Sequence, residues 1–274
     1  MAFAIGALTA VTACNSELTT PTETAAETTG PIAFAKGGKH VRVVSESDVT
    51  RQPEDTPPTD NWVLYFRPGG SAQFTDGPGN PPQGEGSFEM VTPGPDNKFS
   101  LFNFDYHETQ VSDFTELGYQ TYQTSGLPVQ LPSINLTVDL TGGAFVSGDF
   151  ATLVLEPVYN VAQGPIVPAT WQDWDAIFGG QAIWWLTRDA LILGPRGTTF
   201  TWDAFNAAFP EATILGGIGP NQGSGGAALT ASVDEFIVGV GGKHATIYDF
   251  EACDSRKNGK DKCKNKNKGG SDTE

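Results

Sequence analysis

INLTVDL, residues 134–140, is the stretch that decides the fold class of this chain. Ile134, Leu136, Val138 and Leu140 occupy alternate positions, with three polar residues between them. Because successive side chains of a strand point to opposite faces, this period of two indicates a strand with one apolar and one solvated face. Such strands are typical of antiparallel sheets that cover a core on one side only.

Strand-like segments continue on both sides of this stretch. The clearest are residues 62–66, 99–104, 117–122, 152–155, 183–186, 233–240 and 245–250. Turn sequences rich in Gly, Pro, Asn and Asp separate them, such as Pro68-Gly69-Gly70 and residues 76–82. Many short strands with frequent turns predict an all-β fold, an antiparallel two-sheet sandwich of the jelly-roll type.

One short helix is expected at residues 202–209. Thr201 can cap its first turn, and Trp202, Phe205 and Phe209 fall on one helical face. Pro210 ends it, because proline cannot continue a helix. We expect this helix to close one end of the sandwich.

The composition limits the class of protein. The chain has 274 residues, with 32 Asp and Glu against 16 Lys and Arg, and a formal net charge of −16. Such an acidic chain is unsuited to nucleic-acid binding, because phosphate contacts need a basic surface. No apolar run reaches the roughly 18 residues of a membrane span. The acidic body also favours neutral or cationic ligands over anionic ones.

The N-terminus predicts export and a lipid anchor. Residues 1–14 are small and apolar and end in Val11-Thr12-Ala13-Cys14, which resembles the lipobox of bacterial lipoproteins. The resemblance implies lipidation of Cys14, although the basic residues that usually precede such a stretch are missing. An ordinary signal peptide cut near Ala13 and a cytoplasmic protein are the alternatives. Residues 15–38 begin with a segment rich in Thr, Glu, Ala and Pro, which predicts a disordered tether.

Residues 39–251 are therefore expected to form the sandwich domain and residues 252–274 a basic tail. Seven Lys and Arg between positions 256 and 268 indicate a solvated segment or a contact with an anionic polymer or lipid headgroup. Cys253 and Cys263 lie in this tail, and in an exported protein a disulfide between them is the default expectation. A zinc site with His244 is the alternative.

Six short motifs, in their order along the chain, resemble a known group of domains. They are Gly86–Glu89, Leu153–Asn160, Trp171–Asp175, Leu215–Gly225, Val233-Asp234 and Thr246–Glu251. Over roughly residues 60–251 the order resembles secreted jelly-roll domains of the concanavalin-like and laminin-G-like type, and more closely bacterial surface domains of unsettled activity.

The resemblance implies a lectin-like fold in an exported protein and does not imply an enzyme. Domains of this type often hold a structural Ca²⁺ between a loop and the last strand. Oxygen ligands of the kind Ca²⁺ prefers are available at Asp96, Asn97, Asp234 and Asp249. The alternative is that these side chains bind backbone N–H groups in turns. We expect no cofactor to be required.

A carbohydrate site is expected at Trp171-Gln172-Asp173-Trp174-Asp175. Sugar C–H faces stack on Trp rings, and Asp side chains bind hydroxyls, so the candidate residues are Trp171, Trp174 and Asp175. Burial in the core is the alternative for both indoles. Trp184 and Trp185, as neighbours in a strand, should point to opposite faces, and Trp62 and Trp202 should be core residues.

Three functions follow, in order of preference. The first is an exported, membrane-anchored, non-catalytic binding module for a polysaccharide or surface glycan. The second is a structural or adhesion domain without a small ligand. The third is a polysaccharide-cleaving enzyme, for which the sequence offers neither a Gly-x-Ser-x-Gly elbow nor a Glu-x-Asp-x-x-Glu strand. No catalytic residue and no oligomeric state are assigned.

Overall fold

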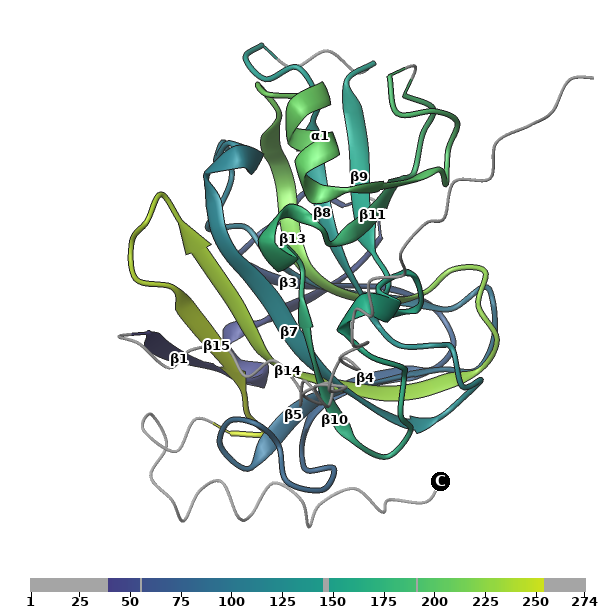
Figure 1. Ribbon diagram of the computed structural model, residues 1–274. Helices are drawn as coiled ribbons and strands as arrows, with labels where there is room; N and C mark the ends of the chain where they lie inside the picture. The colour runs from purple at the N-terminus through teal and green to yellow at the C-terminus, as the bar shows by residue number, and fades with distance from the viewer. Residues whose placement is uncertain (1–38, 55, 145–147, 191, 254–274) are drawn as a thin grey trace, which may run out of the picture. The chain divides into compact units, whose positions relative to one another are not determined.

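Two β-sheets and one α-helix make up the part of the chain that the computed structural model describes (Figure 1). The described residues are 39–54, 56–144, 148–190 and 192–253. The expected lipobox, the tether and nearly all of the basic tail lie outside them. The all-β sandwich with one short helix is confirmed.

The first sheet has seven strands and is built around two long neighbours, β7 (Phe114–Ser125) and β14 (Leu229–Val240). Its path runs through β1 (His40–Val44), β15 (Thr246–Phe250), β14, β5 (Gly86–Thr92) and β4 (Ser71–Asp76). β7 pairs with β14 along most of its length, and β10 (Trp171–Asp175) pairs with the other edge of β7. β10 is therefore an outer strand of this sheet.

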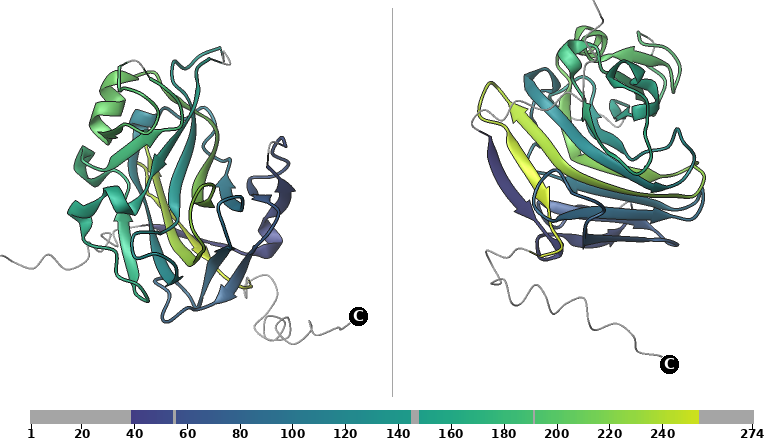
Figure 2. Two further views of the ribbon diagram at one scale, coloured as in Figure 1. Left: turned by 90° about the vertical axis from the view of Figure 1, so that its right-hand side faces the viewer. Right: turned by 60° about the horizontal axis from the view of Figure 1, so that its bottom comes forward.

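The second sheet has eight strands in the order β12-β11-β9-β8-β13-β6-β3-β2. In that order they are Thr199–Thr201, Ile183–Leu186, Phe150–Leu155, Ser133–Asp139, Thr213–Gly223, Lys98–Asn103, Trp62–Arg67 and Thr50–Pro53. Five 3-10 turns lie between strands, at Glu46–Asp48, Val111–Asp113, Pro157–Tyr159, Val161–Gln163 and Phe178–Gly180. Two further views of the sheets are given in Figure 2.

Both sheets are mixed, which corrects the expectation of purely antiparallel pairing. β1 pairs with β15 in parallel, and β2 pairs with β3 in parallel. β1 and β2 are edge strands of different sheets, joined by one short turn, Glu46–Asp48. The N-terminal segment thus passes from the edge of one sheet to the edge of the other, and no hairpin sets its direction.

The core lies between the sheets and is closed by aromatic side chains from both. Trp62 of β3 is 1% exposed, and its ring contacts Tyr248 and Phe250 of β15 at centroid distances of 5.1 and 5.7 Å. Edge-on contacts of this kind add to the stabilisation from burial alone. The expected burial of Trp62 and of Trp202, which is 3% exposed, is confirmed.

The helix α1 (Trp202–Ala208) forms as the sequence predicted. The Thr201 side chain accepts a hydrogen bond from the Ala204 N–H at 3.2 Å, so it caps the first turn. Trp202 and Phe205 are buried, and the Trp202 ring lies 5.5 Å from that of Trp184. Figure 1 shows α1 towards one end of the second sheet. None of the helices in the described part of the chain has the length and apolar character needed to span a bilayer.

The polar face of residues 134–140 is only partly solvated, which is a second correction, since Thr137 is half-buried and its two neighbours on this face are buried. Ile134, Leu136 and Val138 face the core as expected, each 0% exposed, but Asn135 on the opposite face is only 7% exposed. Asp139, 2% exposed, accepts N–H groups of the following turn. Loops fold over this face and leave a pocket on it.

Candidate functional site

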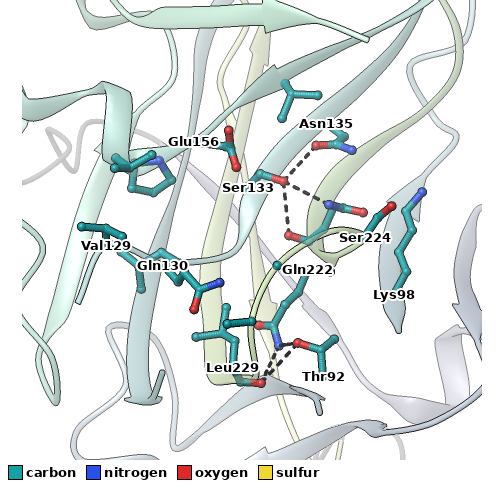
Figure 3. Close-up of a pocket in the computed structure, with 18 of the residues that line it drawn as sticks. Thr92, Lys98, Val129, Gln130, Ser133, Asn135, Glu156, Gln222, Ser224 and Leu229 are labelled. Atoms are coloured by element: carbon teal, nitrogen blue, oxygen red, sulfur yellow. Dashed lines mark hydrogen bonds between the residues drawn. The ribbon is translucent and has the colours of Figure 1, made fainter. Parts of the chain in front are cut away.

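A pocket of about 250 Å³ lies on the side of the second sheet that faces away from the core. The strand residues that line it alternate with core residues: Asn135 with Leu136, Val154 with Leu155, Trp185 with Trp184. Residues 129–131 and 223–229 close it, and it is drawn in Figure 3. The sheet thus carries its hydrophobic core on one face and this pocket on the other.

The floor of the pocket is a network of buried polar side chains. Ser100 Oγ donates to Asn221 Oδ1 at 2.8 Å, and Asn221 Nδ2 donates to Ser133 Oγ at 3.2 Å. Ser133 Oγ in turn donates to Asn135 Oδ1 at 3.0 Å (Figure 3). Within the described residues, Asn135 Nδ2 has no protein acceptor. Because the network fixes its orientation, this amide is available as a positioned donor.

Trp185 and Glu156 form one wall of the pocket. Trp185 is half-buried, and its Nε1–H donates to Glu156 Oε2 at 2.9 Å. Burial raises the pKa of Glu156 above its usual range, against the opposing effect of the Trp185 bond. Trp184 points the other way, is 0% exposed and donates to the Ala176 carbonyl, so the predicted division of the two indoles is confirmed.

Two cationic side chains line the pocket as well, Lys98 and Arg196. Lys98 Nζ lies 2.5 Å from Glu54 Oε1, and Arg67 pairs with the other oxygen of the same carboxylate. Arg67 also donates to Ser224 Oγ at the pocket's edge. Arg196 is exposed, and its backbone N–H is held by Asp189 Oδ1 at 2.8 Å.

Gln222 fixes the end of the pocket at which the two sheets meet. It is 2% exposed, and its Nε2 lies 3.0 Å from each of Met90 O, Thr92 Oγ1 and Leu229 O. Its Oε1 is buried and has no hydrogen-bond partner among the described residues.

The three residues that the sequence favoured for sugar binding do not come together. Trp171 and Trp174 are three positions apart in β10, so they point to opposite faces of the sheet. Trp174 is 1% exposed and donates to Thr121 Oγ1 at 2.8 Å, so it offers no ring face to a ligand. The alternative of core burial therefore holds for Trp174.

The other two members of that set are engaged locally. Trp171 is half-buried and donates to the Pro78 carbonyl at 2.9 Å. Asp175 Oδ1 accepts the N–H groups of Ile177 and Phe178 at 2.9 and 2.7 Å, which orders the turn after β10. The Asp175 carboxylate thus acts as a turn cap.

Asp173 of β10 and Glu235 of β14 form a carboxyl pair that the sequence did not identify. Asp173 Oδ1 is buried and, in the described structure, has no hydrogen-bond partner. Burial and the nearby Glu235 carboxylate raise the pKa of Asp173 to about 7. Glu235 is 5% exposed, accepts from Gln120 Nε2 at 2.6 Å and has a φ of 49° in an irregular part of β14. The β10–β7 and β7–β14 pairings together bring these two acids near each other.

The proposed Ca²⁺ ligands are divided between two places. Asp96 and Asn97 lie in the turn between β5 and β6, where Asn97 binds the Gly94 N–H and the Pro68 carbonyl. Asp234 and Asp249 lie on β14 and β15, and Asp234 accepts the N–H groups of Phe250 and Gln83. Among the described residues no group of three or more His, Cys, Asp or Glu could hold a metal ion. Calcium stays a prediction without an assigned site.

Cys253, the last described residue, is disulfide-bonded. Its expected partner Cys263, like Cys14, lies outside the described residues, so the pairing stays a prediction.

Comparisons with protein-family models, with curated proteins and with solved structures find no match for this chain. The resemblance to jelly-roll surface domains therefore also stays a prediction. The chemistry of the pocket is the basis for assigning a function.

Proposed function

We propose that this chain is an exported carbohydrate-binding module and that its ligand occupies the pocket on the second sheet. Sugar binding needs an aromatic ring for the C–H face and planar polar groups for the hydroxyls. The pocket offers Trp185, Asn135, Glu156 and Arg196 together. Its volume of about 250 Å³ lies just under the range of roughly 300–1,000 Å³ for small-molecule sites, which suits a single sugar unit.

The observation that carries the proposal is the Trp185–Glu156 hydrogen bond of 2.9 Å in the pocket wall, opposite a network of buried amides and hydroxyls. This bond holds the indole and the carboxylate in a fixed relation. Preorganised groups bind a ligand without the entropy cost of ordering side chains.

Binding is favoured over cleavage because glycoside hydrolysis uses two carboxyl groups. Glu156 is the single carboxylate among the described residues that line the pocket. A polysaccharide-cleaving enzyme is the second candidate. The Asp173–Glu235 pair favours it, because two neighbouring carboxyls, one of which has a raised pKa, can serve as acid and base. That reading predicts release of reducing ends that Asp173→Asn and Glu235→Gln abolish.

Export and membrane anchoring through Cys14 are part of the proposal. The disulfide at Cys253 supports export, because disulfides persist in oxidising compartments. Lipidation predicts that the full chain partitions into the detergent phase and that Cys14→Ser returns it to the aqueous phase.

The test is isothermal titration of the full chain with a panel of soluble polysaccharides. We expect saturable binding that Trp185→Phe and Asn135→Ala weaken by about tenfold, as expected for the loss of one good contact. Trp171→Phe, a matched change at the half-buried indole of β10, should leave the affinity unchanged. Binding that depends on Trp171 and ignores Trp185 would contradict the site. No binding by the folded chain would favour a structural or adhesion domain.

A further inference from the structure

Two cationic side chains line the described part of this pocket, although the chain as a whole is acidic. The whole sequence has twice as many acidic as basic side chains, yet Lys98 and Arg196 line the pocket with Glu156 as their one acidic counterpart there. Remote acids act weakly on a bound ligand, because charges are screened over about 8 Å at physiological ionic strength. The local cations therefore decide which ligand charge is favoured.

At one edge, two cations share one carboxylate. Glu54 pairs with Lys98 through Oε1 and with Arg67 through Oε2. Arg67 also reaches Ser224, whose hydroxyl faces the pocket's edge (Figure 3). This cluster of two cations and one carboxylate has a net positive charge, so it stabilises a ligand carboxylate that lies beside it.

Arg196 supplies the second cation. Two hydrogen bonds fix its turn. The Arg196 N–H donates to Asp189 Oδ1, and the Gly197 N–H donates to the Leu186 carbonyl at 3.1 Å. Within the described residues its guanidinium makes no ion pair. A guanidinium binds a carboxylate through two parallel hydrogen bonds, which selects a planar anion over a hydroxyl.

We infer that the pocket selects a sugar unit that carries a carboxylate, a hexuronate of an acidic polysaccharide. The inference rests on the proposed function and adds the class of ligand. A uronate offers a C–H face to Trp185, hydroxyls to Asn135 and a carboxylate to one of the two cations, Arg196 or Lys98, which the strand order places on opposite sides of the pocket. An inorganic anion would use the cations alone. The acidic composition had favoured neutral or cationic ligands, and the local charge of the pocket reverses that expectation.

The test compares one sugar with its carboxylate free and blocked. The full chain is titrated calorimetrically with galacturonate and mannuronate oligosaccharides and with their methyl esters, in 50 and 300 mM NaCl. We expect at least one acid to bind about tenfold more tightly than its ester, and salt to weaken only the acid.

Variants locate the carboxylate. Arg196→Gln should weaken acid binding by about tenfold and leave ester binding unchanged, because no ion pair among the described residues engages the Arg196 guanidinium. The same loss in Lys98→Gln, with Arg196→Gln unaffected, would place the carboxylate at the Glu54 edge instead. Lys243→Gln is the control, because Lys243 is an exposed cation in the turn between β14 and β15. Circular dichroism confirms that each variant is folded.

Three results would overturn the inference. Equal affinity for acid and ester refutes the selection of a carboxylate and leaves the sugar site standing. If sodium sulfate displaces the oligosaccharide as effectively as free galacturonate does, the pocket is a simple anion site. Binding of neither acid nor ester nor any neutral polysaccharide refutes the proposed function together with this inference.

Discussion

Asp173→Asn should make the protein more stable at alkaline pH. The Asp173 carboxyl has a buried oxygen without a hydrogen-bond partner and lies near Glu235. Burial first, and repulsion by Glu235 second, raise its pKa from 3.8 to about 7. The folded state thus holds a proton that the unfolded state releases above pH 4. Stability is therefore greatest below the unfolded pKa and falls as the pH rises towards 7.

The size of this loss of stability follows from the pKa shift of Asp173. Each unit of pKa difference corresponds to about 1.4 kcal/mol, so the full shift corresponds to about 4 kcal/mol. The side chain is partly exposed, and solvent screening reduces this to about 2 kcal/mol. The asparagine variant carries no such charge and keeps the shape of the side chain.

Urea denaturation at pH 4.5 and pH 8, monitored by tryptophan fluorescence, measures this change in stability. The free energy of unfolding of Asp173→Asn, relative to the parent, should rise by about 2 kcal/mol between the two pH values. Acids that do not interact with Asp173 titrate alike in both proteins, so their contributions cancel. Glu235→Gln should move the midpoint of the pH dependence downward, because it removes the repulsion. A variant with the parent's pH dependence, or one that is less stable at pH 8, would refute this account of the carboxyl pair.

Three further outcomes are expected. Thr201→Ala should lower the free energy of unfolding by about 1 kcal/mol in urea denaturation, since the Ala204 N–H loses its cap, whereas Thr201→Ser should retain most of it. Gly223→Ala should cost about 3 kcal/mol in the same assay, because φ is 106° and the new Cβ would lie 2.1 Å from the Asn97 carbonyl oxygen. Glu156→Gln should tighten uronate binding about fivefold at pH 7.5, since a like charge is removed. The parent should also bind uronate more tightly as the pH falls to 4.5, because burial raises the pKa of Glu156 above that value while the uronate stays ionised. Equal titration curves at pH 7.5 and 4.5 would contradict this.

Local chemistry made much of the fold predictable. The strand at 183–186 and the helix capped by Thr201 follow from alternation, helical periodicity and capping, all properties of adjacent residues. The parallel edges β1 and β2 were not predicted, because their direction depends on strands far away in the sequence.

The position of the candidate pocket was not predicted from the sequence. The sequence favoured Trp171, Trp174 and Asp175, whereas the pocket is lined by Trp185 and Glu156. The alternation that separates Trp184 from Trp185 also separates residues three apart, so it already argued against pairing Trp171 with Trp174. The pocket itself arises from the pairing of β8, β9, β11 and β13 and from the loops over them, which a single sequence does not reveal.

The indole N–H signals of the ¹⁵N-labelled full chain give the most direct test of the pocket as a sugar site. The signals of Trp185, Trp171 and Trp174 are assigned from the spectra of the corresponding Trp→Phe variants. On titration with a hexuronate oligosaccharide, the Trp185 Nε1–H, which bonds Glu156 in the pocket wall, should shift saturably. The Trp174 signal, from an indole buried in the core, should stay in place. A shift of the Trp171 signal with Trp185 unchanged, or no shift at any ligand concentration, would contradict the account.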